Sequence, residues 1–458
     1  MTAPRRCCSI KMDTRKKYIL AGSVLGLLTL AALVALWWGS YDYGLWGRAA
    51  ALLSAGLFAL LGLRFVPSWV DFWSASPLPA APEGDEPRGM ALRIFFALLG
   101  LDLLILLFAW AFRAALGHGG SFADTLSFWT CTDSQHYLAI AEDWYLSEGS
   151  IDRLVQLVFL PGYPVLVRLL QHLTGNYLTA GLAVSALCFA GAGVVFYRLL
   201  RLDLPHESAH RALLFLCLMP GSFFYPAPMS ESLFLLCSLA CVYLSRRDRW
   251  LLAGLCGAWA AFTRSLGLML LAPLVMELVA ETVRKKSPTK TLVPRIASLL
   301  LVPLGFAAYC VINYLVAGNP FQFMIYQAEH WSQHLGLFFN TAAYQTERAI
   351  MSLADKPQNF LGLWLPNLIY GFSALALTAA AAKKLRASYT AWFIAYFIIA
   401  IGATWLLSAP RYLMAMPVLP LALALLTEKD SAKTGAVISL TLLWLLYFIA
   451  FLQRWQVW

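Results

Sequence analysis

Long apolar runs, repeated along the whole chain, limit most strongly what this sequence can fold into. A run of about 18 or more apolar residues can cross the hydrocarbon core of a bilayer as a helix. The chain of 458 residues is 60% hydrophobic and only 13% charged, and its mean hydropathy is +0.68. Because backbone polar groups inside a bilayer must be bonded internally, such runs fold as helices. The sequence therefore predicts an all-α polytopic membrane protein.

The apolar runs also predict how the chain is divided. Residues 18–38 and 49–66 predict an N-terminal two-helix hairpin, whose first run is long and lacks a small-residue cleavage site, so we expect it to be retained. A Pro-, Ala- and acid-rich loop follows, which places a hairpin with its linker at 1–90 and a membrane body at 91–458. Further spans are predicted at about 91–112, 177–197, 211–228, 230–245, 250–264, 266–283, 294–317, 359–382, 388–407, 411–426 and 434–452.

Basic residues predict the orientation. Lys and Arg gather in short loops, as in the cytoplasmic loops of membrane proteins, at 15–17, 198–211, 246–249, 284–295, 383–386 and 429–433. With the N-terminus in the cytoplasm, about thirteen spans place all of these loops on the cytoplasmic side. The net charge of +10 is thereby explained by topology, and we expect no nucleic-acid binding.

The stretch 128–142 lies between apolar runs and is expected at a membrane surface. On a helix, Asp133, His136 and Tyr137 share one face at i, i+3 and i+4. A carboxylate, an imidazole and a phenol are suited to moving a proton off a hydroxyl. An interfacial amphipathic helix whose polar face meets water fits the same spacing. The segment 157–164, with two prolines and a glycine, predicts a re-entrant or surface helix pair.

Three polar residues near the ends of predicted spans fall on the same, extracytoplasmic side as Asp133. They are Glu231, Arg264 and Arg411, and their convergence predicts one cavity. Arginines can hold a lipid phosphate and stabilise it as it leaves, while a carboxylate accepts the proton of an incoming hydroxyl. Each residue also has a plainer interpretation, since arginines snorkel to lipid headgroups and an acid stabilises a helix N-terminus.

The sequence lacks the motifs that mark several other enzyme chemistries. HExxH, CxxC, Walker and GxGxxG motifs do not occur, so we predict neither a metal site nor a cofactor. The cysteines lie mostly in apolar runs, and no disulfide framework is predicted. Asp102 lies inside a predicted span, where an ionisable side chain should be paired or line a cavity.

Taken together, the polar motifs resemble the PIG-V-like mannosyltransferases, the GPI mannosyltransferase II family within the GT-C glycosyltransferases. The motifs are spread over roughly 128–417, in the family's order. Two departures are Asn319, where the family usually has an aspartate, and Trp144-Tyr145, where a glycine-tyrosine pair is common. The matching segments are Phe128-Trp129, 132–142, 159–164, 219–224, 230–234, 263–267, 318–321 with Gln327 and Trp331, and Arg411-Tyr412 before Pro417.

The resemblance implies a GT-C-type bundle of about 11 core transmembrane helices behind the hairpin, with amphipathic or re-entrant helices in the first outer loop. It implies transfer of a sugar, typically mannose, from a polyprenyl-phosphate donor to a hydroxyl of a lipid-linked or other extracytoplasmic acceptor. Asp133 matches the position of the general base, and His136 is the motif histidine beside it. The residues implied to bind substrate are Tyr137, Glu231, Arg264, Gln327, Trp331 and Arg411.

The expected partners are thus a lipid-linked sugar donor and a membrane lipid or glycolipid acceptor, with room for an accessory membrane subunit. The membrane would be the plasma membrane of a bacterium or the endoplasmic reticulum of a eukaryote. Two other functions stay open. A lipid or sugar transporter would be expected to show repeat symmetry and polar residues through the whole bilayer depth, whereas a membrane scaffold would have lost activity.

Overall fold

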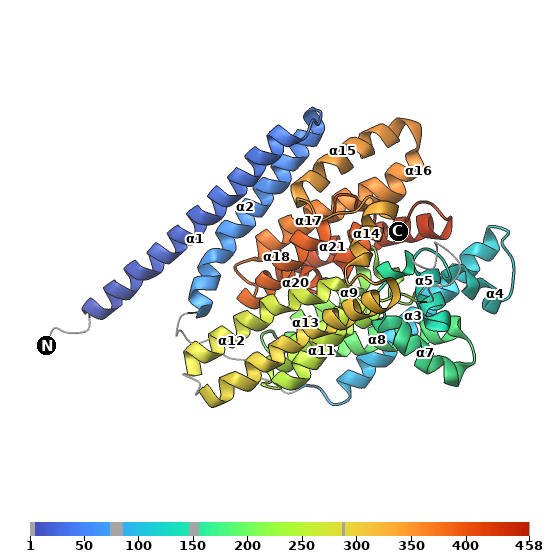
Figure 1. Ribbon diagram of the computed structural model, residues 1–458, viewed down its shortest axis with the longest axis horizontal. Coiled ribbons are helices and arrows are strands. Elements are labelled where there is room, and N and C mark those ends of the chain that lie inside the picture. Colours follow the sequence, from blue (N-terminus) through green and yellow to red (C-terminus); the bar gives the residue numbers. More distant parts are fainter. Residues whose placement is uncertain (1–4, 74–85, 146–154, 286–288, 458) are drawn as a thin grey trace.

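The computed structural model describes residues 5–73, 86–145, 155–285 and 289–457, with the side chains of 5–13, 284, 285 and 289 left aside (Figure 1). Every regular element in these ranges is helical, and the bridge between Leu335 and Ala403 is isolated. Eight helical segments of the described chain are long and apolar enough to cross a membrane. They are 14–40, 45–73, 90–115, 177–200, 265–283, 290–317, 357–381 and 430–452. The prediction of an all-α polytopic membrane protein is confirmed.

The shorter helices explain why fewer segments qualify than the sequence predicted. Two are apolar but have only 14 and 15 residues, α11 (Trp250–Thr263) and α18 (Ala387–Ile401). The predicted span 211–228 is wrong in extent, because α9 (His206–Leu218) stops before Pro220-Gly221 and a 3-10 turn, η3 (Ser222–Phe224), follows. The predicted span 411–426 is likewise broken at Pro417, which separates α19 (Ala409–Met414) from α20 (Val418–Leu426).

The remaining helices follow the predicted order. On the N-terminal side of α9 they are α1 (Arg5–Ser40), α2 (Leu45–Trp73), α3 (Met90–Ala115), α4 (Phe122–Leu126), η1 (Ser127–Trp129), α5 (Ser134–Asp143), η2 (Gln156–Val158), α7 (Gly162–Thr174) and α8 (Tyr177–Leu200). On its C-terminal side they are α10 (Glu231–Arg246), η4 (Ser265–Leu270), α12 (Leu271–Lys285), α13 (Thr289–Ala317), α14 (Gln322–Trp331), α15 (Phe338–Asp355), α16 (Pro357–Asn359), η5 (Phe360–Trp364), α17 (Leu365–Ala381) and α21 (Asp430–Leu452).

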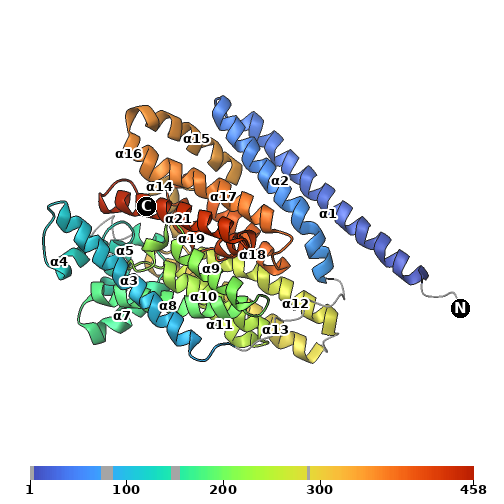
Figure 2. The ribbon, with the colours of Figure 1, turned by 180° about the vertical axis from the view of Figure 1, so that it is seen from behind.

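The helices α1 and α2 form a long hairpin along one side of the body, visible in both views (Figures 1 and 2). Its inner helix packs on α15 and α17, and its tip is tied to α15 through Asn340. The Asn340 side-chain oxygen accepts hydrogen bonds from Trp37 Nε1 at 2.8 Å and from the Tyr43 hydroxyl at 3.0 Å. The hairpin therefore holds α15, and the division of the chain near residue 90 stays a prediction.

The closest helix pair is α11 with α13, which cross where both carry small residues. A methyl group added to Gly254 would lie 2.2 Å from the carbonyl oxygen of Ser298, and one on Gly305 would lie 1.9 Å from that of Ala258. Only glycine allows the two backbones to approach this closely, which is how small residues mediate helix association in membranes. This seam continues directly into Thr263 and the site described below.

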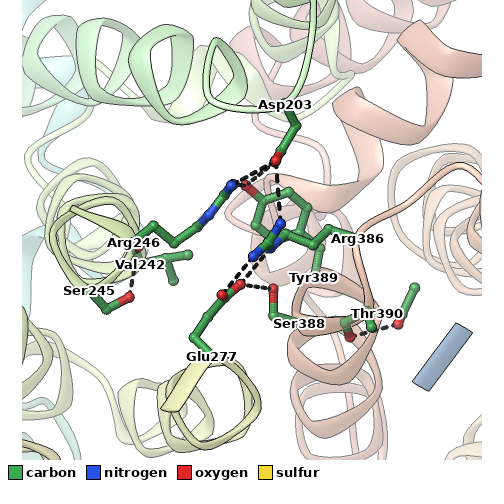
Figure 3. A network of polar contacts seen from close by, with 10 residues as sticks. Asp203, Val242, Ser245, Arg246, Glu277, Arg386, Ser388, Tyr389 and Thr390 are labelled. Carbon is green, nitrogen blue, oxygen red and sulfur yellow. Dashed lines mark hydrogen bonds and ion pairs between the residues drawn. The ribbon is translucent and has the colours of Figure 1, made fainter. Parts of the chain in front are cut away.

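A polar network joins the last turn of α10 to the first residues of α18 (Figure 3). We call the four charged residues Asp203, Arg246, Glu277 and Arg386 the ring network. Arg246 donates to both oxygens of Asp203 at 2.5 and 2.7 Å. Arg386 donates to both oxygens of Glu277 at 2.6 and 2.8 Å, so each carboxylate is held by a two-point contact.

Asp102, in α3, differs from the expectation that it is paired. Its residue is 2% exposed, and neither carboxylate oxygen has a hydrogen-bond partner among the described residues. Of the two alternatives, a partner is therefore wrong for the described residues, and a cavity beside Asp102 stays a prediction. Its neighbours in sequence on the same face of α3 are apolar, which explains why none of them satisfies it.

Candidate active site

The turn before α5 fixes the direction of Asp133. Ser134 donates from its hydroxyl to the carbonyl oxygens of Trp129 at 2.6 Å and Cys131 at 2.5 Å. These bonds close a tight turn in which Thr132 takes a φ of 52°, a conformation that β-branched residues rarely adopt. Such backbone strain is tolerated where surrounding contacts impose it, and it is frequent at functional sites. Here it places Asp133 at the N-cap position of α5.

Four charged residues from separate elements meet around Asp133, and we call them the acid–arginine cluster: Asp133, Glu231, Arg264 and Arg411. Arg411 Nη2 donates to Asp133 Oδ2, and Arg411 Nε lies 3.2 Å from Glu231 Oε1. Arg264 Nη1 donates to the same Glu231 oxygen at 2.6 Å. The structure thus brings together the carboxylates and arginines that the predicted topology placed on one side.

Exposure differs sharply within the acid–arginine cluster. The side chains of Glu231, Arg411 and Arg264 are 2%, 5% and 10% exposed, whereas that of Asp133 is 29% exposed. Moreover, Glu231 Oε2 is buried and has no hydrogen-bond partner in the described part of the chain. Asp133 is therefore the carboxylate that a molecule from outside can reach, and Glu231 is the anchor behind it.

Neutral side chains complete the inner side of the cluster. The Ser230 hydroxyl contacts Arg264 Nη1 at 3.1 Å and the Tyr137 hydroxyl at 2.8 Å. Burial raises the pKa of Tyr137 well above its ordinary value, with a smaller opposing effect of Arg264. The phenol is thus neutral and serves as a hydrogen-bonding group, not as a base. Burial also raises the pKa of the Cys131 thiol to about 11, so the thiol next to this turn is not an activated nucleophile.

On the outer side, three rings follow one another in contact, and we call His136, Phe159 and Trp331 the aromatic row. The His136 ring stacks on Phe159 with centroids 4.7 Å apart and an interplanar angle of 17°. Phe159 in turn meets the edge of Trp331, 6.3 Å away. Gln327 lies one turn before Trp331 on α14, and its backbone oxygen accepts a hydrogen bond from Gln333 N at 3.0 Å. No hydrogen bond joins the Gln327 side chain to other described residues.

The elements that carry these residues are brought together by close backbone contacts. A methyl group on Gly162, the first residue of α7, would lie 2.3 Å from Thr263 Oγ1. A larger residue would push α7 away from the backbone that leads into Arg264. The helix break predicted in this segment is present, because η2 ends at Val158 and α7 begins only after Pro161; Pro164 lies in the first turn of α7, where proline is tolerated.

Sequence reasoning missed three contacts of the site. Ser230 links Tyr137 to Arg264, Phe159 supports His136, and the Tyr412 ring lies under the Arg264 guanidinium, 4.9 Å from its centroid. Ser230, Phe159 and Tyr412 all lie within the segments that resemble the family's motifs. Their roles depend on which elements face each other, which a motif does not state.

The arrangement is suited to proton transfer next to a bound anion. Among the described residues, no group of three or more His, Cys, Asp or Glu side chains is placed to hold a metal ion. A small hollow lies elsewhere, between α2, α15, α17 and α18, and not at the acid–arginine cluster. The cluster instead consists of charged groups in direct contact, so a ligand there must exchange contacts with them.

Comparison with known proteins shows that part of the sequence is similar to one family and to several of its named members. Residues 117–327 match the family described as Mannosyltransferase (PIG-V), a range that includes the cluster residues except Arg411. The chain is 33% identical over 207 residues to mouse GPI alpha-1,6-mannosyltransferase 2, an alignment that covers 41% of each protein. It is 35% identical over 156 residues to the human protein of that name, covering 31% of this chain and 30% of the relative. The chain thus spans about two fifths or less of the curated relatives it matches. Over residues 117–327 the chain is thus similar to the PIG-V mannosyltransferases, and its apolar helices make it an integral membrane protein.

Proposed function

We propose that the protein is a mannosyltransferase that uses a polyprenyl-phosphate mannose donor and a lipid-linked glycolipid acceptor. The observation that carries the proposal is the contact with Arg411 of the partly exposed Asp133, which lies inside the region that matches a mannosyltransferase family. The relatives are named for transfer of mannose in GPI assembly, and a glycolipid acceptor is consistent with those names.

Asp133 is the proposed general base. An acceptor hydroxyl gives its proton to the carboxylate while its oxygen forms a bond to C1 of mannose. The bond between C1 and the phosphate oxygen breaks, and polyprenyl phosphate leaves with the electron pair. Asp133 suits this step because its side chain is 29% exposed while Arg411 holds its Oδ2 in place.

Arg264 and Arg411 are the proposed phosphate ligands. Charge-assisted hydrogen bonds from guanidinium groups are well suited to phosphate and to the charge that grows on it as it leaves. In the structure both arginines are neutralised by Glu231 and Asp133. Donor binding therefore requires that the phosphate compete with, or share, the oxygen of Glu231 that both guanidinium groups contact.

The aromatic row is the proposed platform for the sugar. Aromatic faces stack well against the apolar faces of sugars, and Trp331 and Phe159 lie beside His136 at the edge of the cluster. His136 then orients the acceptor or Asp133. The unpaired Oε2 of Glu231 offers a further acceptor for a ligand hydroxyl or an ordered water.

The test is reconstitution of the purified protein in lipid nanodiscs with radiolabelled polyprenyl-phosphate mannose and membrane lipids. We expect a labelled glycolipid that the Asp133→Asn variant does not form. Binding of the donor without any product, under conditions where wild-type folding is verified, would support a scaffold. Movement of unchanged donor across the bilayer would support a transporter.

A further inference from the structure

The irregular segment 402–408 leads directly into α19 and hence to Arg411. Apart from the Gly402 N–H, which donates to the Ile398 carbonyl oxygen at 3.0 Å in the last turn of α18, this segment is not helical and is held by neighbours on both sides. Thr404 N donates to the His334 carbonyl oxygen at 2.8 Å, and Leu406 N donates to the Tyr344 hydroxyl at 2.5 Å. The position of Arg411 therefore depends on groups that lie outside the acid–arginine cluster.

Asn367, on α17, is bonded to both sides of the turn that starts α19. Its side-chain oxygen accepts a hydrogen bond from Ala409 N at 2.9 Å, and its Nδ2 donates to the Leu406 carbonyl oxygen at 3.3 Å. Asn367 is 1% exposed, so water does not easily replace these bonds. One buried side chain thus fixes the residues before and after Leu407-Ser408.

The first turn of a helix leaves backbone N–H groups without intrahelical partners. In α19 the preceding Ser408 makes no capping hydrogen bond with its side chain, and the second residue is Pro410, which has no N–H. The Ala409 N–H is satisfied by Asn367 instead, from a helix more than 40 residues earlier in the chain. Arg411 follows only two residues after this bond.

We propose that Asn367 is a positioning residue for Arg411: it sets the start of α19 so that the guanidinium reaches Asp133 and Glu231. The proposal rests on the proposed function in that Arg411 is taken to hold the donor phosphate. Shifts of a fraction of an ångström in such a group reduce binding and turnover markedly. Asn367 itself touches neither Asp133 nor Glu231 in the structure, so it acts through Arg411.

The first experiment does not need a substrate. Hydrogen–deuterium exchange of residues 402–414 is compared in the full-length wild type, Asn367→Leu and Thr378→Val. Thr378 lies on the same helix, is 0% exposed, and its hydroxyl has no hydrogen-bond partner among the described residues, so its variant controls for loss of a buried polar group. We expect about tenfold faster exchange at 406–412 in Asn367→Leu only. Equal exchange in all three proteins overturns the proposal.

The second experiment measures binding of radiolabelled polyprenyl-phosphate mannose and the KM of the acceptor. Asn367→Leu should weaken donor binding about tenfold and leave the acceptor KM unchanged, and it should add little to Arg411→Lys because both act through the same guanidinium. Additive losses in that double variant would overturn the proposal.

If Asn367→Leu does not fold, Asn367→Ala takes its place, since it removes the same two hydrogen bonds with a smaller side chain. If the wild type binds no donor, the proposed function fails, while the exchange experiment still decides the role of Asn367.

Discussion

The acid–arginine cluster and the ring network contain the same groups, two carboxylates and two arginines, yet they are built differently. In the ring network every carboxylate oxygen of Asp203 and Glu277 accepts a hydrogen bond, and Ser388 adds another to Glu277 at 2.6 Å. In the acid–arginine cluster Arg264 and Arg411 share a single oxygen of Glu231, and its other oxygen has no partner in the described residues.

The difference teaches how to separate a structural network from a reactive one. A network whose donors and acceptors are all satisfied stabilises one arrangement and has no group left for a ligand. In the acid–arginine cluster, Glu231 Oε2 and Arg411 Nε have no hydrogen-bond partner among the described residues and Asp133 is partly exposed, so the cluster keeps hydrogen-bonding capacity in reserve. The two lie at opposite ends of α10, since Glu231 is its first residue and Arg246 its last, about 22 Å apart along the helix axis at 1.5 Å per residue.

The largest expected effect is on chemical labelling from one side of the membrane, which should be either complete or absent at a given position. Because Ser134 and Asn340 are buried, single cysteines are best placed at the exposed positions Gln135 and Lys384. A membrane-impermeant thiol reagent applied from outside should label Gln135→Cys and spare Lys384→Cys, since basic loops stay in the cytoplasm. Labelling of both positions from one side would break the assignment of the two clusters to opposite membrane faces.

Next in size is the effect of Asp133→Asn. The amide keeps the shape of the side chain but cannot accept the acceptor's proton, so turnover should fall by about a hundred- to ten-thousand-fold while the donor still binds. Turnover and donor binding are measured on the same preparation. His136→Ala should cost less if the imidazole only orients its neighbours, whereas an equal or greater loss would make His136 the base and Asp133 its partner. A normal rate in Asp133→Asn would return the α5 stretch to an amphipathic surface helix.

Arginine-to-lysine changes compare the two clusters directly. Lysine keeps the charge but loses the planar fork, so Arg264→Lys and Arg411→Lys should weaken donor binding about tenfold. The matched change Arg386→Lys, in the ring network, should lower the free energy of unfolding by about 1–2 kcal/mol and leave donor binding unchanged. Thermal unfolding and donor titration are run on all three. Unchanged donor binding in both cluster variants would make these arginines structural.

The smallest expected effect separates the two glutamates. Glu231→Gln removes the charge that competes with a phosphate for both arginines, so donor binding should tighten by up to about tenfold, or about 1.4 kcal/mol. Glu277→Gln, its counterpart, should lower only the thermal stability, because no ligand binds there. Both variants should lose thermal stability, since each removes the negative charge that pairs with buried guanidinium groups. Weaker donor binding in Glu231→Gln would mean that Glu231 orients the arginines for phosphate and does not compete with it.

The helical architecture followed from the sequence because apolar length alone decides whether a segment crosses a bilayer. Glu231 is a good example, since its place after a proline-rich turn and before an apolar run predicted a helix end. Counting the predicted spans then placed Glu231, Arg264 and Arg411 at the same face of the membrane. Such counting works for helix ends because each end lies at one of two membrane faces, but it does not predict distances between side chains.

The parts that could not be predicted depend on irregular backbone. The predicted span that contains Arg411 is split at Pro417, and its first turn is positioned by Asn367, which no motif marked. Gln327 belongs to a recognised motif, yet its side chain has no hydrogen bond within the described residues. Such outcomes are set by how loops such as 402–408 pack on neighbouring helices, and hydrophobic periodicity carries no information on that packing.

The glycine seam between α11 and α13 also bears on how the protein is made. The helix α11 has 14 residues and is therefore about 21 Å long at 1.5 Å per residue. That is less than the thickness of the hydrocarbon core, which is roughly 30 Å. During synthesis it leaves the ribosome before α13, whose Ser298 and Gly305 it needs for its closest contacts. We therefore expect α11 to stay beside the translocon, as a partly inserted intermediate, until α13 arrives. Nascent chains stalled after residue 285 should then crosslink to the insertion machinery through α11, and chains stalled well beyond residue 317 should not.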